Sequence, residues 1–124
     1  MVSFRVTGVP VAKPRMTQRD RWAQRPAVVR YRAYADALRL AAPKNLPTEP
    51  MSIMVTFRIP MPATWPKWKR QQMIGAPHRQ KPDLSNLLKS VEDALWPEDS
   101  LIAHVQAEKF WTSWAGMTLV YVRG

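Results

Sequence analysis

The chain has 124 residues, which is enough for one domain with a substantial core but too few for two. It contains no cysteine, so disulfides, zinc–thiolate sites and thiol nucleophiles are excluded. Its 19 Lys and Arg residues against 9 Asp and Glu residues give a formal net charge of +10, which favours binding to polyanions such as nucleic acids.

The N-terminal sequence has no long apolar stretch behind a basic start. No window approaches the roughly 18 apolar residues that a transmembrane helix needs, so we expect neither a signal peptide nor a membrane partner. Together with the absence of cysteine, this predicts a protein of the reducing cytoplasm.

The first elements are a strand, a basic loop and a helix. Residues 2–7 alternate apolar and polar side chains, which is typical of a half-buried strand, and Gly8 and Pro10 end it. Residues 12–26 contain five basic residues and two prolines, so we expect a long basic loop. Residues 27–42 place an apolar stripe at helical spacing, from Val28 to Ala42.

The second half begins with a strand over residues 51–60, whose predicted inner face is Ile53, Val55, Phe57 and Ile59. A short helix follows, capped by Thr64 with Pro66 near its first turn, and then a helix from Asp83 to about Leu95. Two strands, 101–111 and 116–124, close the chain around a turn at 113–116. This order predicts a single α+β domain over residues 1–124, a small mixed sheet with helices packed on one face.

Five of the nine acidic residues fall within residues 83–99, in a chain that is otherwise basic. Carboxylates repel DNA phosphates unless a divalent cation lies between them, so this acidic segment suggests a metal site for phosphodiester hydrolysis. Asp83 and Asp99 meet in one chain only if the turn after the helix carries Asp99 back alongside the sheet.

Several short motifs occur in order along the chain. "KPDLSNLLKSVEDAL" followed by "PEDSLI", with "GVPVAKPR" and "MPATWPKWKR" before them, resembles the RusA family of Holliday-junction resolvases, which is common in phages and prophages. The resemblance covers roughly residues 4–122. It implies a homodimeric endonuclease of DNA recombination and repair that uses Mg²⁺, or Mn²⁺, and no small-molecule cofactor. It also implies cleavage of branched DNA by paired symmetric nicks, in the cytoplasm of a bacterial or phage-infected cell.

The resemblance assigns roles to individual residues. Asp83 and Asp99 match metal-binding aspartates, Lys89 matches the catalytic lysine, and Asn86 matches the asparagine beside the second aspartate of the motif. Ser85 stands where that second aspartate is expected. A serine hydroxyl brings no negative charge, which weakens the site for a divalent ion.

Ser85 leaves two alternatives for the metal site. Another carboxylate, from Glu98, Asp93 or Glu108, can replace the missing charge, and Ser85, Asn86 and Glu98 are further candidate ligands. Alternatively, the protein binds branched DNA and cuts it slowly or not at all.

Asp83 and Lys89 also have simpler interpretations. Asp83 is suited to be a helix-terminal charge that interacts with the helix dipole, worth under about 1 kcal/mol. Lys89 and Asp93 are spaced for a surface ion pair, which would occupy the lysine.

The candidate DNA contacts are basic residues in three segments. They are Lys13, Arg15, Arg19 and Arg21 in the early loop, Lys67, Lys69 and Arg70 in "KWKR", and Arg79 and Lys81 before Asp83. His78 is a further candidate for phosphate contact. Trp65 and Trp68 alternate with these cations, which suits stacking on unpaired bases, but packing of one helix face onto the sheet explains them equally well.

Overall fold

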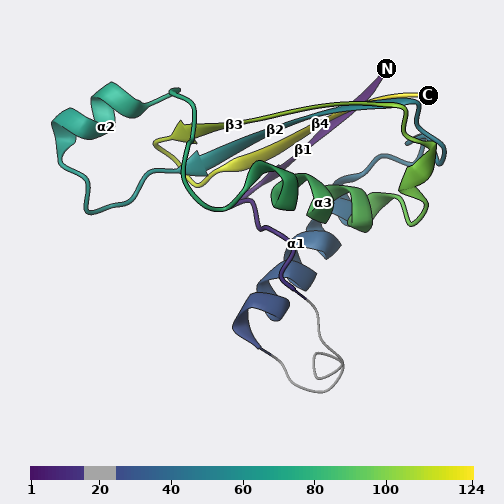
Figure 1. Cartoon of the computed structure of the whole chain (residues 1–124), viewed down its shortest axis with the longest axis horizontal. Coiled ribbons are helices and arrows are strands. Elements are labelled where there is room, and N and C mark those ends of the chain that lie inside the picture. The colour runs from purple at the N-terminus through teal and green to yellow at the C-terminus, as the bar shows by residue number, and fades with distance from the viewer. Residues whose placement is uncertain (16–24) are drawn as a thin grey trace.

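The computed structural model describes residues 1–15 and 25–124, and at Asp99 it describes only the main chain. Four strands and three α-helices follow the predicted order (Figure 1), which confirms the α+β class. A short 3-10 helix, η2, covers Asp99–Leu101. The other elements are β1 Val2–Thr7, α1 Pro26–Ala41, β2 Ser52–Pro60, α2 Lys67–Met73, α3 Leu84–Leu95, β3 His104–Thr112 and β4 Met117–Arg123.

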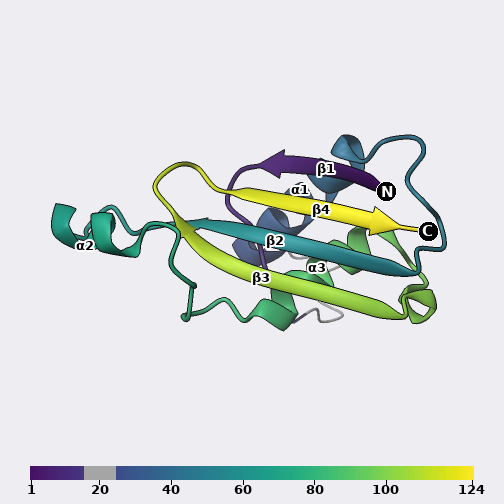
Figure 2. The same cartoon turned by 90° about the horizontal axis from the view of Figure 1, so that it is seen from above.

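The strands form one mixed sheet in the order β1-β4-β2-β3 (Figure 2). β4 runs antiparallel to both β1 and β2, whereas β2 and β3 are parallel, in register from Ser52↔His104 to Pro60↔Thr112. A parallel pair needs a long crossover connection, and this one contains α2 and α3. The crossover returns the chain to the end of the sheet at which β2 begins.

Helices α1 and α3 cover one face of the sheet (Figures 1 and 2), as the sequence predicts. The apolar residues of α3 recur at helical spacing, so that Leu87 and Val91 are fully buried. The predicted inner face of β2 is buried too: Ile53, Val55, Phe57 and Ile59. None of the helices in residues 1–15 and 25–124 is long and apolar enough to cross a membrane.

Helix α2 differs from the prediction at its start. The N-cap residue is Pro66, with no side-chain capping hydrogen bond, so the expected cap by Thr64 is wrong. Proline is favoured at helix starts because its φ angle is already helical and its missing N–H is not needed there. None of the helix's seven residues is buried, and α2 projects beyond the end of the sheet (Figures 1 and 2).

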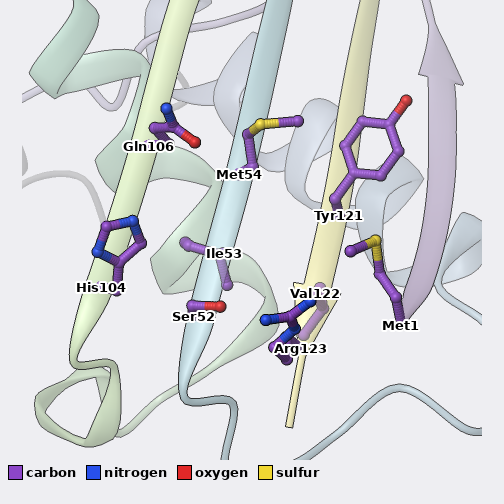
Figure 3. A pocket seen from close by; sticks show the side chains of 9 residues that line it. All are labelled: Met1, Ser52, Ile53, Met54, His104, Gln106, Tyr121, Val122 and Arg123. Atoms are coloured by element: carbon purple, nitrogen blue, oxygen red, sulfur yellow. The ribbon is translucent and has the colours of Figure 1, made fainter.

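The opposite face of the sheet has no helix over it in the described part of the chain (Figure 1). A hollow of about 410 Å³ lies there, against β2, β3 and β4 (Figure 3). Its polar side chains include His104, Gln106, Tyr121 and Arg123, and none of its lining residues is acidic. Because this lining has no carboxylate, the group that usually holds Mg²⁺, and Arg123 adds a positive charge, the hollow is not suited to be the metal site.

Candidate active site

Asp83 lies at the N-cap position of α3, yet its side chain makes no capping hydrogen bond and is exposed. The segment before it is held against β3 by Lys109, whose Nζ donates hydrogen bonds to the carbonyl oxygens of Gln80 and Pro82 at 2.6 and 2.7 Å. The helix start is thus anchored through the main chain. The Asp83 carboxylate faces solvent instead of closing the helix, which disfavours a purely capping role.

Lys109 is a residue of this site that the sequence prediction missed. Burial lowers its pKa, and the nearby Asp83 carboxylate acts in the opposite direction. The signal for Lys109 lies in the alternation of β3. Glu108 and Lys109 are adjacent, so their side chains point to opposite faces of the sheet, and one of the two charges must face the helix layer.

A hollow of about 460 Å³ opens at the start of α3. It is lined by Lys81, Pro82, Asp83 and Asn86, so a carboxylate, an amide and an ammonium group surround one space. The carbonyl oxygen of Asn86 accepts a hydrogen bond from the main-chain N–H of Lys13 at 3.2 Å. This places Lys13, near the start of the early basic segment, beside the hollow. Ser85, on the first turn of α3, is exposed.

Asp99 lies at the other end of α3 from Asp83. The helix has 12 residues, and at 1.5 Å per residue it is about 18 Å long. Glu98, the residue before Asp99, accepts hydrogen bonds from Ser100, which lower the pKa of the Glu98 carboxyl. The turn after α3, which contains η2, leads into the start of β3 at His104, and Lys109 lies further along that strand. Within one chain, Asp99 and Glu98 are therefore at the opposite end of α3 from Asp83.

The other two candidate replacements for the missing aspartate are occupied elsewhere. Asp93 accepts a hydrogen bond from the ammonium group of Lys13, and this bond raises the pKa of Lys13. Glu108 is on the helix-free face of the sheet, where it accepts a hydrogen bond from Thr56 Oγ1 at 3.1 Å. Among the described residues there is no group of three or more His, Cys, Asp or Glu side chains that can hold a metal ion.

Lys89 lies two turns into α3, and 58% of its side chain is exposed. Its Nζ is 4.0 Å from Asp93 Oδ1, at the limit of an ion pair, whereas Lys13 is bound to the same carboxylate directly. The i,i+4 pair predicted from the sequence therefore forms only weakly. An exposed pair of this kind contributes at most a few tenths of a kcal/mol, which leaves Lys89 able to reach a ligand.

The predicted DNA contacts divide into three sets. Arg79 and Lys81 are exposed directly before Asp83, and Lys67, Lys69 and Arg70 are on α2. Lys13 is engaged with Asp93, and the main-chain oxygen of Arg15, two residues further on, accepts a hydrogen bond from Arg25 at 2.9 Å. Arg19 and Arg21 lie outside the described residues.

A model of the protein family described as "Endodeoxyribonuclease RusA" matches residues 7–122, nearly the whole chain. The chain belongs to the RusA endodeoxyribonuclease family. The predicted resemblance to this family is thereby confirmed. The hollow at Asp83 is lined by residues of the "KPDLSN" segment. No individual curated protein matches the chain.

Nucleases of the RusA family generally use divalent metals. The described residues of one chain do not fit such an ion, because Asp83 is the one carboxylate that they place around the hollow. A divalent ion in protein is usually surrounded by several oxygen ligands, often from more than one carboxylate. A complete metal site therefore needs ligands from outside this set.

Proposed function

We propose that this RusA-family chain is a Mg²⁺-dependent endonuclease that resolves four-way DNA junctions by paired symmetric nicks during recombination and repair. The observation that carries the proposal is the exposed Asp83 carboxylate, held at the start of α3 beside Lys109 within a family match over residues 7–122. We place its action in the cytoplasm of a bacterial or phage-infected cell, which its lack of cysteine favours.

The roles of the surrounding residues follow from their charge and position. Arg79 and Lys81 are exposed beside Asp83 and are placed to bind the phosphates that flank the scissile bond. Lys89, exposed on the same helix, is the candidate for stabilising negative charge that develops on the phosphate. Lys109 acts through the main chain by fixing the position of Asp83.

A homodimer is part of the proposal. Two symmetric nicks across a junction require two sites related by a two-fold axis. The length of α3 adds a second argument, because Asp83 and Asp99 flank a helix of about 18 Å and a metal–oxygen bond is only about 2.0–2.1 Å for Mg²⁺. If both aspartates bind one ion, they belong to different protomers.

The test compares a synthetic four-way junction with linear duplexes of the same sequences. We expect cleavage of the junction at symmetric positions with Mg²⁺, weaker or altered cleavage with Mn²⁺, and none when a chelator removes the metal. Equal cleavage of the junction and the duplexes would contradict the junction specificity. Cleavage that persists with the chelator would contradict the metal requirement.

The second candidate function is a branched-DNA-binding protein that no longer cuts. Ser85 favours it, because the hydroxyl brings no charge and the described residues supply no replacement carboxylate beside Asp83. The two candidates differ in one readily measured property. A functional metal site raises the thermal midpoint by mass action when Mg²⁺ or Mn²⁺ is added, whereas the binding-only protein shows no shift at millimolar metal but still binds the junction.

A further inference from the structure

Helix α2 and the segment before it form a basic arm. The helix KWKRQQM has three cations, no acid and no buried residue, and it projects from the end of the sheet (Figures 1 and 2). Residues 50–82 as a whole contain six Lys and Arg residues and no Asp or Glu. No carboxylate of this segment neutralises the positive charge of the arm. The arm is therefore suited to bind an anion.

A hollow of about 580 Å³ lies under this arm, within the size range of small-ligand sites. Its apolar wall is formed by Met61, Trp65 and Ile74. Its polar rim includes Lys67, Arg70 and Gln71. An apolar slot bordered by cations and an amide matches a ligand with a flat, mostly apolar part next to a phosphate.

The wall of the hollow is already fixed in the protein without a ligand. Trp65 packs against Trp111 with 4.8 Å between ring centroids, and the ammonium group of Lys69 lies 4.2 Å from the Trp65 ring. Arg70 Nη1 donates a hydrogen bond to the carbonyl oxygen of Pro62 at 2.8 Å. Trp65, which precedes α2, thus packs onto the sheet, whereas Trp68 on α2 is 65% exposed, so the predicted packing of a face of this helix onto the sheet is wrong. The packing of Trp65 also orders its ring before binding, which lowers the entropic cost of a ligand.

We propose that this hollow binds an unpaired nucleotide of the DNA, with the base against Met61, Trp65 and Ile74 and the phosphate at Lys67 and Arg70. A base inside a duplex is stacked and cannot enter a side pocket, whereas a base at a branch point can leave its stack at lower cost. The site thus recognises unpaired DNA near the junction. The inference rests on the proposed function for its biological setting, but it needs neither metal nor cleavage.

The experiment measures binding of two single strands of equal length, an oligothymidylate and a fully abasic oligonucleotide, with a chelator present. Wild-type protein is expected to bind the oligothymidylate about tenfold more tightly, because one stacked base contributes roughly 5- to 150-fold in affinity. Ile74→Ser, which removes part of the apolar wall, is expected to abolish most of this preference. Lys67→Glu is expected to weaken binding of both strands.

Matched controls separate the hollow from general effects. Leu40→Ser removes an apolar side chain that is 89% exposed on α1, and Lys44→Glu makes the same charge change in the connection between α1 and β2. Both should keep the wild-type preference, and Lys44→Glu should weaken binding less than Lys67→Glu does. Thermal midpoints of all variants establish that they are folded.

Three results would overturn the proposal. The first is equal binding of both strands by the wild type, and the second is an unchanged preference for the oligothymidylate in Ile74→Ser. The third is conversion of a dimer into a monomer by Ile74→Ser, because this would assign the hollow to a second copy of the chain. If the protein fails to cleave junctions but prefers the oligothymidylate through Ile74, the proposed nuclease function fails and this site stands.

Discussion

Lys109 Nζ donates a hydrogen bond of 2.7 Å to the carbonyl oxygen of Pro82, the residue directly before Asp83. A second bond from the same ammonium group reaches Gln80. One lysine on β3 therefore determines where the proposed catalytic carboxylate at the start of α3 is placed. The segment that leads into α3 is joined to β3 by this contact.

Lys109→Met should remove both hydrogen bonds and leave two carbonyl oxygens without this donor. Bonds to a charged donor contribute about 1.5–3 kcal/mol, reduced here by partial exposure, so we expect the free energy of unfolding to fall by about 1–2 kcal/mol. Junction cleavage should fall further than stability explains, because Asp83 is displaced. Urea denaturation and cleavage assays measure the two effects, with Lys44→Met as the control. Cleavage equal to that of Lys44→Met would show that Lys109 does not position Asp83.

Lys89→Met should lower junction cleavage by about 100-fold, the typical effect of removing one group that stabilises transition-state charge. Stability should change by less than about 0.5 kcal/mol, because the 4.0 Å contact with Asp93 is exposed. Asp93→Asn keeps Lys89 but removes its weak pair together with the direct contact between Asp93 and Lys13, so Lys13→Met is measured beside it. If Asp93→Asn lowers cleavage as much as Lys89→Met and Lys13→Met does not, Lys89 acts as an ion-pair partner and has no direct role at the phosphate.

Ser85→Asp should have two separable effects. The first turn of α3 has no acidic residue, so a new carboxylate there should raise the free energy of unfolding by about 0.3–1 kcal/mol without metal. It also adds a ligand beside Asp83, so the increase in thermal midpoint with Mg²⁺ and the rate of cleavage should both grow. Differential scanning fluorimetry with and without metal separates the effects. An unchanged metal response would show that another group already fills the position.

His78 should make stability depend on pH. Its ring packs on Trp111 at 4.1 Å, its buried Nδ1 has no hydrogen-bond partner among the described residues, and burial, with a smaller effect of Lys109, lowers its pKa below 6.5. The folded state therefore binds this proton less readily than the unfolded state does. The stabilisation is present above the unfolded pKa and is lost as the pH falls through the folded pKa.

We expect the thermal midpoint to fall between about pH 7.5 and about pH 5.5, a range in which most carboxylates remain ionised. His78→Phe, which keeps an aromatic ring against Trp111, should flatten this dependence. His104→Gln alters an exposed histidine and should keep the wild-type profile. Identical profiles for His78→Phe and the wild type would remove His78 as the source.

The main elements of the fold could be predicted from local patterns. Apolar residues at a period of 3.6 on α3 and at a period of 2 on β2 are buried, because the helix and the sheet pack their apolar faces against each other in one core. The start of α2 could not be predicted as well. A short helix with no buried residue has no packing to fix its limits, so Pro66 rather than Thr64 decides where it begins.

The sequence predicts the candidate site as a set of residue types but not as a geometry. The motif identifies Asp83 and its neighbours, yet the separation of Asp83 from Asp99 depends on the direction in which the chain leaves α3. Lys109 is 26 positions from Asp83 in sequence and meets it only because β3 packs beside the start of α3. The alternation of β3 indicates that Lys109 or Glu108 faces the helix layer, but only tertiary packing decides that Lys109 meets the start of α3.

The central claim is that Asp83 belongs to a junction-cutting site. The most direct measurement compares wild-type protein and Asp83→Asn on a synthetic four-way junction with Mg²⁺, with binding followed separately by gel mobility. We predict that Asp83→Asn binds the junction at least as well, because a negative charge near the phosphates is removed, and that its cleavage falls by at least about 100-fold. Equal cleavage by both proteins would remove Asp83 from the mechanism and contradict the account.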